Sequence, residues 1–218
     1  MNRIFQKQVV FIGGVQGAGK TSLCEALKRE HSCHSVKQRQ ALIKTGQKYG
    51  LKWEEVAALH DEFITEAAES VAREFLDDSN SEILLVDCHY AIRANKALRL
   101  KEKIAASSYI QDIDDRFINR LGLDFRIRFV LIDVLPSIAV TRFGERPIEF
   151  LDYDNTLEGL HLQRQAEQEK YTNIAKRLKV SDQDLLRISN NCEFENMVNG
   201  VNQFIAYSSL ISRNVLLV

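Results

Sequence analysis

The feature that most constrains the fold of this chain is a cluster of glycines near its N-terminus. Four of the ten glycines lie at positions 13, 14, 17 and 19, directly after the apolar run 9–12. From Thr21 onward the residues favour a helix, so the glycines connect a strand to a helix. Residues 14–21, GVQGAGKT, fit the pattern G-x-x-x-x-G-K-S/T in the context that this pattern requires. We therefore expect a loop whose backbone N–H groups turn inward and hold a nucleotide phosphate at the helix N-terminus.

The same loop predicts the cofactors and the residues that hold them. Lys20 is expected to reach the β- and γ-phosphates of ATP, and the Thr21 hydroxyl to ligate Mg²⁺. Nucleotide contacts are expected from the whole stretch of Gly14, Val15, Gln16, Gly17, Ala18, Gly19, Lys20, Thr21 and Ser22. The predicted cofactors are ATP and Mg²⁺, and the loop itself does not distinguish ATP from GTP.

Composition excludes several other classes of protein. The 218 residues carry a net charge of −1, and 45% of them are hydrophobic and 27% charged, as in a globular protein rather than a disordered one. No basic block of the kind that a DNA-packing protein needs is present. The four cysteines form no CxxC pair, and neither a signal peptide nor an apolar run of about 18 residues is apparent. We expect a cytoplasmic protein that does not span a membrane.

Strand and helix patterns alternate along the chain. Apolar runs predict strands at 9–12, 34–37, 82–87, 125–134 and 185–189. Helices are predicted at 39–49, 53–75, 136–143, 155–178 and 193–207. Asn155 is the expected N-cap of the fourth of these helices, with Glu158 three positions later. The alternation indicates an α/β fold with a parallel sheet covered by helices on both faces. We expect a single domain, 1–218, with helical insertions near 38–78 and 144–160.

Two carboxylates end predicted strands and compete for the metal site. Asp87 ends one apolar strand, and Asp133 lies near the end of another. A carboxylate in this position holds Mg²⁺ directly or through water in P-loop proteins. We prefer Asp87, because Cys88, His89 and Tyr90 add polar groups at the same end of the sheet. His89 has two interpretations: it orients Asp87 or an acceptor hydroxyl, or it is a buried, hydrogen-bonded histidine.

Three arginines form a further group with a predicted catalytic role. Arg142 lies in the last turn of a predicted helix, Arg146 lies in the turn-rich segment after it, and Arg164 lies about two turns into the next helix. All three can converge over the phosphates if that segment closes. Guanidinium groups suit this role, since they donate bidentate hydrogen bonds to the oxygens of a transferring phosphoryl group. The alternative is that they are solvated or paired with neighbouring carboxylates.

On these residues the chain resembles the nucleoside monophosphate kinases of the P-loop class, and among them most closely the archaeal-type adenylate kinases. The resemblance is carried by GGVQGAGKT at 13–21, ILLVDCH at 83–89, TRFGERPIE at 141–149 and the later Arg164. It implies a three-layer fold with a five-stranded parallel sheet, an acceptor-binding helical insert at 38–78 and an arginine-bearing lid at 144–160. It also implies that Lys20 binds phosphate, that Thr21 and Asp87 serve the metal, and that Arg142, Arg146 and Arg164 contact the transferring group.

The sequence departs from that family in the expected acceptor site. Archaeal-type adenylate kinases carry an arginine within the acceptor insert, whereas no arginine occurs here between Arg39 and Arg73. The cations left to contact an acceptor are Lys37, Arg39 and Arg93, and each of them is alternatively an ordinary surface residue. The basic segment 93–103 is either a solvated stretch or a collar for a second phosphorylated ligand such as RNA.

These features favour one function over two alternatives. We expect an ATP-dependent kinase that moves the γ-phosphoryl group to a nucleoside monophosphate or a similar small phosphorylated acceptor. The alternatives are an ATPase or nucleotide-dependent switch acting on a protein or RNA partner, and a scaffold that binds nucleotide without turnover. The GTPase motifs N/T-K-x-D and D-x-x-G are missing. Arginines in a lid favour transfer, because water must be kept from the phosphoryl group. Assembly into a homo-oligomer stays open.

Overall fold

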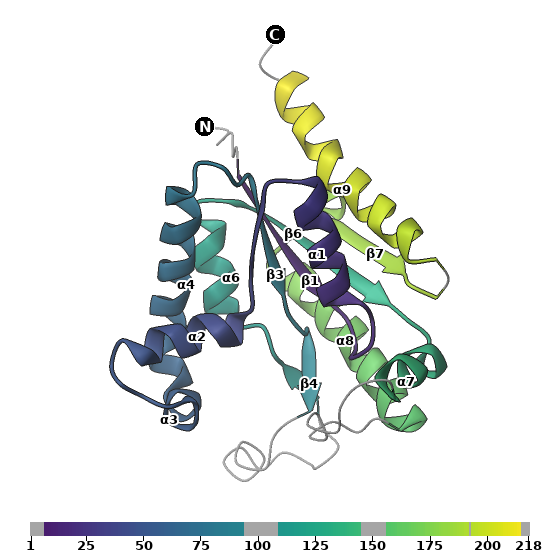
Figure 1. The fold of residues 1–218 in the computed structure, drawn as a ribbon, viewed down its shortest axis with the longest axis horizontal. Helices are drawn as coiled ribbons and strands as arrows, with labels where there is room; N and C mark the ends of the chain where they lie inside the picture. Colours follow the sequence, from purple (N-terminus) through teal and green to yellow (C-terminus); the bar gives the residue numbers. More distant parts are fainter. Residues whose placement is uncertain (1–6, 94–108, 145–155, 192, 215–218) are drawn as a thin grey trace.

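The computed structural model describes residues 7–93, 109–144, 156–191 and 193–214 (Figure 1). Its centre is a five-stranded sheet in the order β2-β3-β1-β6-β7, in which every neighbouring pair is parallel. The strands are β1 (Gln8–Gly13), β2 (Cys33–Val36), β3 (Ile83–Asp87), β6 (Arg126–Asp133) and β7 (Leu185–Ser189). Because β1 is the central strand, the glycine-rich loop that follows it emerges in the middle of the carboxyl edge of the sheet.

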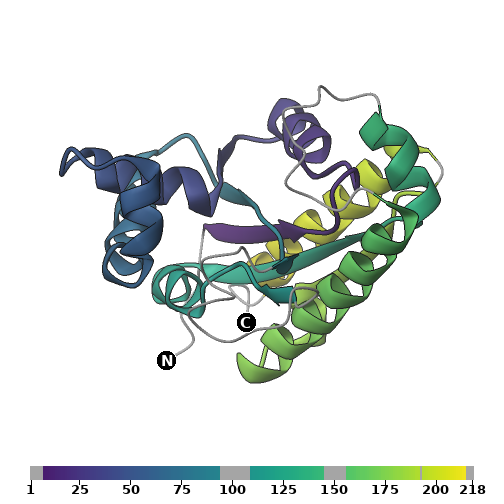
Figure 2. The same ribbon diagram turned by 90° about the horizontal axis from the view of Figure 1, so that it is seen from below.

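Helices cover both faces of this sheet (Figures 1 and 2). They are α1 (Lys20–Glu30), α2 (Gln38–Gln47), α3 (Trp53–Ala58), α4 (His60–Asp77), α6 (Asp115–Gly122), α7 (Pro136–Gly144), α8 (Leu157–Arg177) and α9 (Phe194–Asn214). Side chains of β1 alternate between the faces. Val9 and Phe11 pack into a core with α2, α4 and α6, whereas Val10 and Ile12 pack into a second core with α1, α7 and α9. The predicted α/β fold with a parallel five-stranded sheet is confirmed.

The predicted continuous helix over 53–75 is wrong. The chain forms α3 and α4 instead, and Leu59 between them leaves the helical conformation with φ −104° and ψ 24°. Val56 of α3 packs directly onto Gly46 of α2, where an added Cβ would lie only 2.1 Å from Val56 Cγ2. This close crossing of α2 sets the direction of α3, so one straight helix cannot satisfy both the crossing and the packing of α4.

The ends of the last two helices also differ from the predictions. Thr156 is the N-cap of α8, and its hydroxyl accepts a hydrogen bond from the Gly159 N–H at 3.0 Å. The predicted cap, Asn155, and the 145–155 part of the predicted lid lie outside the described residues. α9 continues to Asn214, seven residues beyond its predicted end. Among the helices of the described ranges, none combines the length and the apolar character needed to cross a membrane.

The two strands of a ribbon and one helix were not predicted at all. An antiparallel ribbon of β4 (Ala91–Arg93) and β5 (Tyr109–Gln111) follows β3, and α6 comes after it. β4 begins close behind Asp87, so the ribbon extends from the carboxyl edge of the sheet (Figure 1). Residues just after β5 are therefore brought to the same edge as the glycine-rich loop.

Candidate active site

The loop between β1 and α1 requires glycine at several positions. Gly14, Gly17 and Gly19 have φ values of 143°, 77° and 93°, which residues with a Cβ rarely adopt. A Cβ on Gly14 would lie 2.5 Å from the Ile132 carbonyl oxygen, and one on Gly17 would lie 2.9 Å from that of Ala139. The glycines thus let the loop lie against β6 and α7, with the N-terminus of α1 directed at it, as phosphate binding requires.

Lys20, the first residue of α1, is turned back into the loop. Its Nζ donates to the carbonyl oxygens of Gly14 at 2.7 Å and Val15 at 3.1 Å, and the residue is 8% exposed. Burial lowers the pKa of Lys20, while the negative charges of Glu167 and Asp87 oppose that shift. A buried ammonium held at the loop by carbonyl groups is suited to bind phosphate as a point charge.

Thr21 and Asp87, the predicted metal residues, lie together. Thr21 Oγ1 donates to Asp87 Oδ2 over 3.0 Å, although the two residues are 66 positions apart. Hydroxyl and carboxylate oxygens suit Mg²⁺, which usually takes one or two such groups together with substrate phosphates. The pair therefore fits a magnesium ion. Lys37 at the end of β2 lies with its Nζ 3.4 Å from the same carboxylate oxygen.

Arg142 lies against the loop through a residue that the sequence did not point to, Asn190. The Arg142 guanidinium donates to the Asn190 carbonyl at 3.1 Å and to the Gly17 carbonyl at 3.4 Å. Asn190 directly follows β7, is 2% exposed, and donates through Nδ2 to the Ala18 carbonyl at 2.8 Å. Asn190 therefore links the carboxyl end of β7 to the loop and positions Arg142 beside it.

Asp133, the rival metal carboxylate, is engaged elsewhere. Arg164 donates to it through two nitrogens, at 2.5 Å and 3.0 Å, and Arg187 donates at 2.6 Å. Burial alone raises the pKa of Asp133, but the hydrogen bonds from both arginines outweigh burial and hold the pKa below its usual value. The arginine pairing favours Asp87 over Asp133 for the metal. Convergence of Arg142, Arg146 and Arg164 stays a prediction, since Arg146 lies outside the described residues.

Replacing Asp133 by asparagine should lower the free energy of unfolding by about 1 to 2 kcal/mol at pH 7, because charge-assisted hydrogen bonds are lost. The loss is no larger because both arginines are partly exposed, and solvent weakens their interaction with the carboxylate. Because the pKa of Asp133 is lowered in the folded state, its carboxylate stabilises the fold fully above about pH 4, and this contribution disappears as the pH falls further. Urea unfolding at pH 7 and pH 3 should show the difference between wild type and variant shrinking in acid. Asp124→Asn, which breaks the surface pair with Arg120, is the matched control. An equal loss in that control would contradict the assignment.

The three predicted acceptor cations have different surroundings. Lys37 is the one beside Asp87, as described above. Arg39 stacks on the Trp53 ring, with its guanidinium carbon 4.4 Å from the ring centroid. Arg93 ends β4, but its side chain is outside the described set. Gln38, which lies between Lys37 and Arg39 in the sequence, is buried and bridges α2 to the chain after β5. Its side chain donates to the Asp112 carbonyl and accepts from the Asp114 N–H.

His89 proves to be a hydrogen-bonded histidine held by Glu167 of α8. Its Nδ1 lies 2.7 Å from Glu167 Oε1, and the other oxygen of Glu167 accepts the Tyr90 N–H, also at 2.7 Å. Glu167 is 1% exposed. This carboxylate ties α8 to the chain directly after Asp87. No signal in the sequence marks Glu167, because it is one of many charged residues in a predicted helix.

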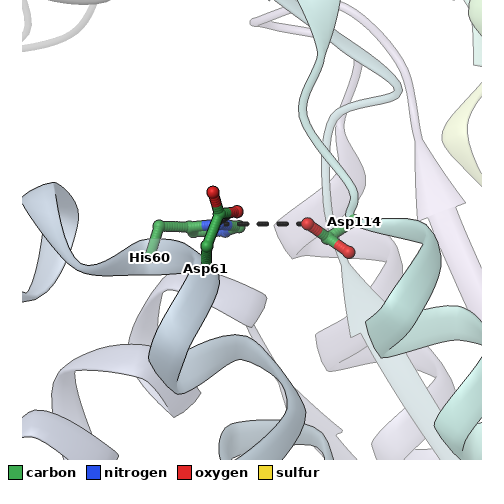
Figure 3. A group of neighbouring side chains, drawn as sticks. All are labelled: His60, Asp61 and Asp114. Carbon is green, nitrogen blue, oxygen red and sulfur yellow. Dashed lines mark ion pairs between the residues drawn. The ribbon is translucent and has the colours of Figure 1, made fainter.

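Figure 3 shows the one other group of metal-ligating side chains found in the described part of the chain: His60, Asp61 and Asp114. His60 Nδ1 lies 3.7 Å from Asp61 and 3.9 Å from Asp114. The Arg116 guanidinium pairs with both carboxylates, at 2.6 Å and 2.7 Å. Because Arg116 already compensates their charge, the group is an ion-pair junction between α4 and α6.

The strand order and the loop define a P-loop kinase fold, and comparison with solved structures agrees. The chain is similar to a shikimate kinase from Bacteroides thetaiotaomicron, with a TM-score of 0.52 and 12% identity over 91% of this chain and 98% of that one. For a gluconokinase from Sinorhizobium meliloti 1021 the TM-score is 0.44, with 15% identity over 97% of both chains. No protein-family model and no curated protein matches the sequence. The first likeness supports the fold, and the narrower resemblance to archaeal-type adenylate kinases gains no support from it.

Proposed function

We propose that this protein is a phosphotransferase that moves the γ-phosphoryl group of ATP to a small acceptor. The observation that carries the proposal is the 3.0 Å hydrogen bond between Thr21 and Asp87, directly beside the buried Lys20. It brings together the lysine, hydroxyl and carboxylate that P-loop enzymes use on phosphates and magnesium. A kinase of this fold that acts on a small molecule, as the name shikimate kinase states for the similar structure, agrees with this proposal.

Each functional residue at the glycine-rich loop has a task in the proposed reaction. Lys20 binds the β- and γ-phosphates, and Thr21 and Asp87 hold Mg²⁺, which neutralises phosphate charge when bound. Arg142 stabilises the transferring group. Arg146 and Arg164 are proposed to join it, which for Arg164 requires release from Asp133.

The acceptor is proposed to bind between the helical segment 38–78 and the β4–β5 ribbon, with 144–160 as a lid. Lys37, Arg39 and Arg93 are the proposed acceptor contacts. The resemblance to nucleoside monophosphate kinases makes a nucleoside monophosphate one candidate acceptor, and small hydroxyl compounds are the other. Each class makes a different chemical product, which the test below separates.

The test is to incubate the protein with Mg²⁺, γ-labelled ATP and a panel of acceptors, comprising nucleoside monophosphates, nucleosides and small hydroxyl compounds. We expect one class to receive label in an amount equal to the ATP consumed, and to increase ATP consumption. Release of free phosphate at one rate, whatever acceptor is added, would contradict the proposal and support an ATPase or nucleotide-dependent switch.

A further inference from the structure

Asp112 is a partly buried carboxylate at the carboxyl edge of the sheet that the proposed reaction does not yet use. Its backbone N–H donates to the Tyr90 carbonyl at 3.2 Å, and its own carbonyl accepts from Gln38 of α2 at 3.2 Å. The side-chain carboxylate accepts a hydrogen bond from the His89 backbone N–H. No side chain among the described residues donates to it. Asp112 is therefore fixed in place by its neighbours while its carboxylate keeps free acceptor capacity.

Asp112 also lies within electrostatic reach of the phosphate loop. Burial raises the pKa of Asp112, and the charge of Glu167 from α8 adds to this. The charges of His89, from the turn after β3, and Lys20, from the loop, act in the opposite direction but do not cancel it. The carboxylate thus belongs to the same group of charges as Lys20.

A second observation comes from the face of α8 that borders this group. Gln163 is 5% exposed, and its Nε2 has no hydrogen-bond partner within the described ranges. It lies one helical turn before Glu167, so both side chains leave the same face of α8. Glu167 in turn contacts His89 and Tyr90. A buried donor without a partner is unfavourable, and an oxygen atom of a bound ligand would satisfy it.

The charges near Asp112 disfavour a phosphate as the acceptor group. Glu167 acts on the pKa of both Lys20 and Asp112, and Asp87 acts on the pKa of Lys20. Of the described ammonium groups, Lys20 is assigned to the phosphates of ATP, and Lys37 lies 3.4 Å from Asp87. A phosphate monoester would bring further negative charge beside these carboxylates. A hydroxyl brings none, and its proton can be donated to a carboxylate.

We propose that the acceptor group is a hydroxyl of a small molecule without a phosphate of its own, that Asp112 binds this hydroxyl and takes its proton, and that Gln163 donates to the same molecule. This inference rests on the proposed phosphotransferase function. The hydroxyl oxygen forms a bond to the γ-phosphorus while the bond from that phosphorus to the bridging oxygen of ADP breaks. The proton passes to Asp112 and then to water, so the products are a phosphate ester, ADP and a proton. A base with a raised pKa suits this step.

The experiment compares Asp112→Asn with wild type and with Asp77→Asn, an exposed residue at the end of α4. Since the pKa of Asp112 is raised, its ionisation disfavours the folded state increasingly above about pH 4. The asparagine variant should therefore melt no lower than wild type at pH 7. Label from γ-labelled ATP is followed into the acceptor panel, and the products are heated in dilute acid. Phosphate esters keep their label under this treatment, and the phosphoanhydrides of nucleoside diphosphates release it.

We expect label in an acid-stable ester and a kcat for Asp112→Asn that is about 10²- to 10⁴-fold lower, the range for loss of a general base. The KM for ATP should be unchanged, and the acidic limb of the pH–rate profile should disappear in this variant but not in Asp77→Asn. Acid-labile label, or an ester formed equally fast by Asp112→Asn, would overturn this inference while leaving the phosphotransferase proposal standing. Failure of every acceptor to take label would overturn both.

Discussion

Replacing Lys20 by alanine should reduce phosphoryl transfer by at least about 10³-fold, because a preorganised, buried charge at the phosphates is lost. Among the described residues, Lys20 Nζ is hydrogen-bonded only to the carbonyls of Gly14 and Val15. The ammonium is therefore already placed where the β- and γ-phosphates are proposed to bind. The measurement is the initial rate of label transfer at saturating ATP, with Lys28→Ala, an exposed lysine of the same helix, as the matched control.

The fold of this variant should persist. Burial lowers the pKa of Lys20, so the ammonium form carries the cost of a desolvated charge in the folded state. Alanine removes this cost together with two hydrogen bonds, and the free energy of unfolding should change by no more than about 1 kcal/mol. Wild-type turnover in a folded Lys20→Ala protein would show that the loop is not the site of the reaction.

The parts of the molecule that the sequence predicted are those set by local rules. The spacing of Gly14, Gly17 and Gly19 before Lys20 has few uses other than a loop at a helix N-terminus, and their positive φ values agree. The strands β1, β3 and β6 were recognisable because both of their faces are buried, which demands continuous apolar runs. Once the sheet is parallel, residues at the strand ends meet at one edge, and that rule brought Thr21 and Asp87 together.

The parts that escaped prediction depend on contacts distant in sequence. Asn190 and Glu167 are polar residues among polar neighbours in the sequence. Their burial becomes visible only once β7 has joined the sheet and α8 has packed on it. Arg128, in contrast, is a charged residue with apolar neighbours in the sequence. It lies in an apolar strand, is 1% exposed, and its guanidinium stacks 3.6 Å from the centre of the Phe204 ring of α9. Partners of this kind follow from tertiary packing, which neither propensity nor periodicity encodes.

Tertiary contacts also distinguish two of the predicted catalytic arginines from each other. Arg164 and Arg142 had equal standing from the sequence, since both were expected at the phosphates. Arg164 is paired with Asp133, whereas Arg142 contacts backbone carbonyls and, within the described part of the chain, no carboxylate. Of these two arginines, Arg142 is therefore the one whose positive charge is available to an anionic group at the loop.

Replacing Arg142 by alanine should lower kcat by about 10²- to 10⁴-fold with little change in ATP affinity, since a contact that strengthens in the transition state acts on kcat rather than on ground-state binding. Arg142→Lys should restore only part of the rate, because an ammonium lacks the planar fork that donates to two phosphoryl oxygens. The measurements are single-turnover label transfer for kcat and equilibrium titration for ATP affinity. Arg73→Ala, on the exposed face of α4, is the matched control and should behave as wild type. A normal kcat in Arg142→Ala, or full rescue by lysine, would remove Arg142 from the transferring group and leave it the single task of holding Asn190 against the loop.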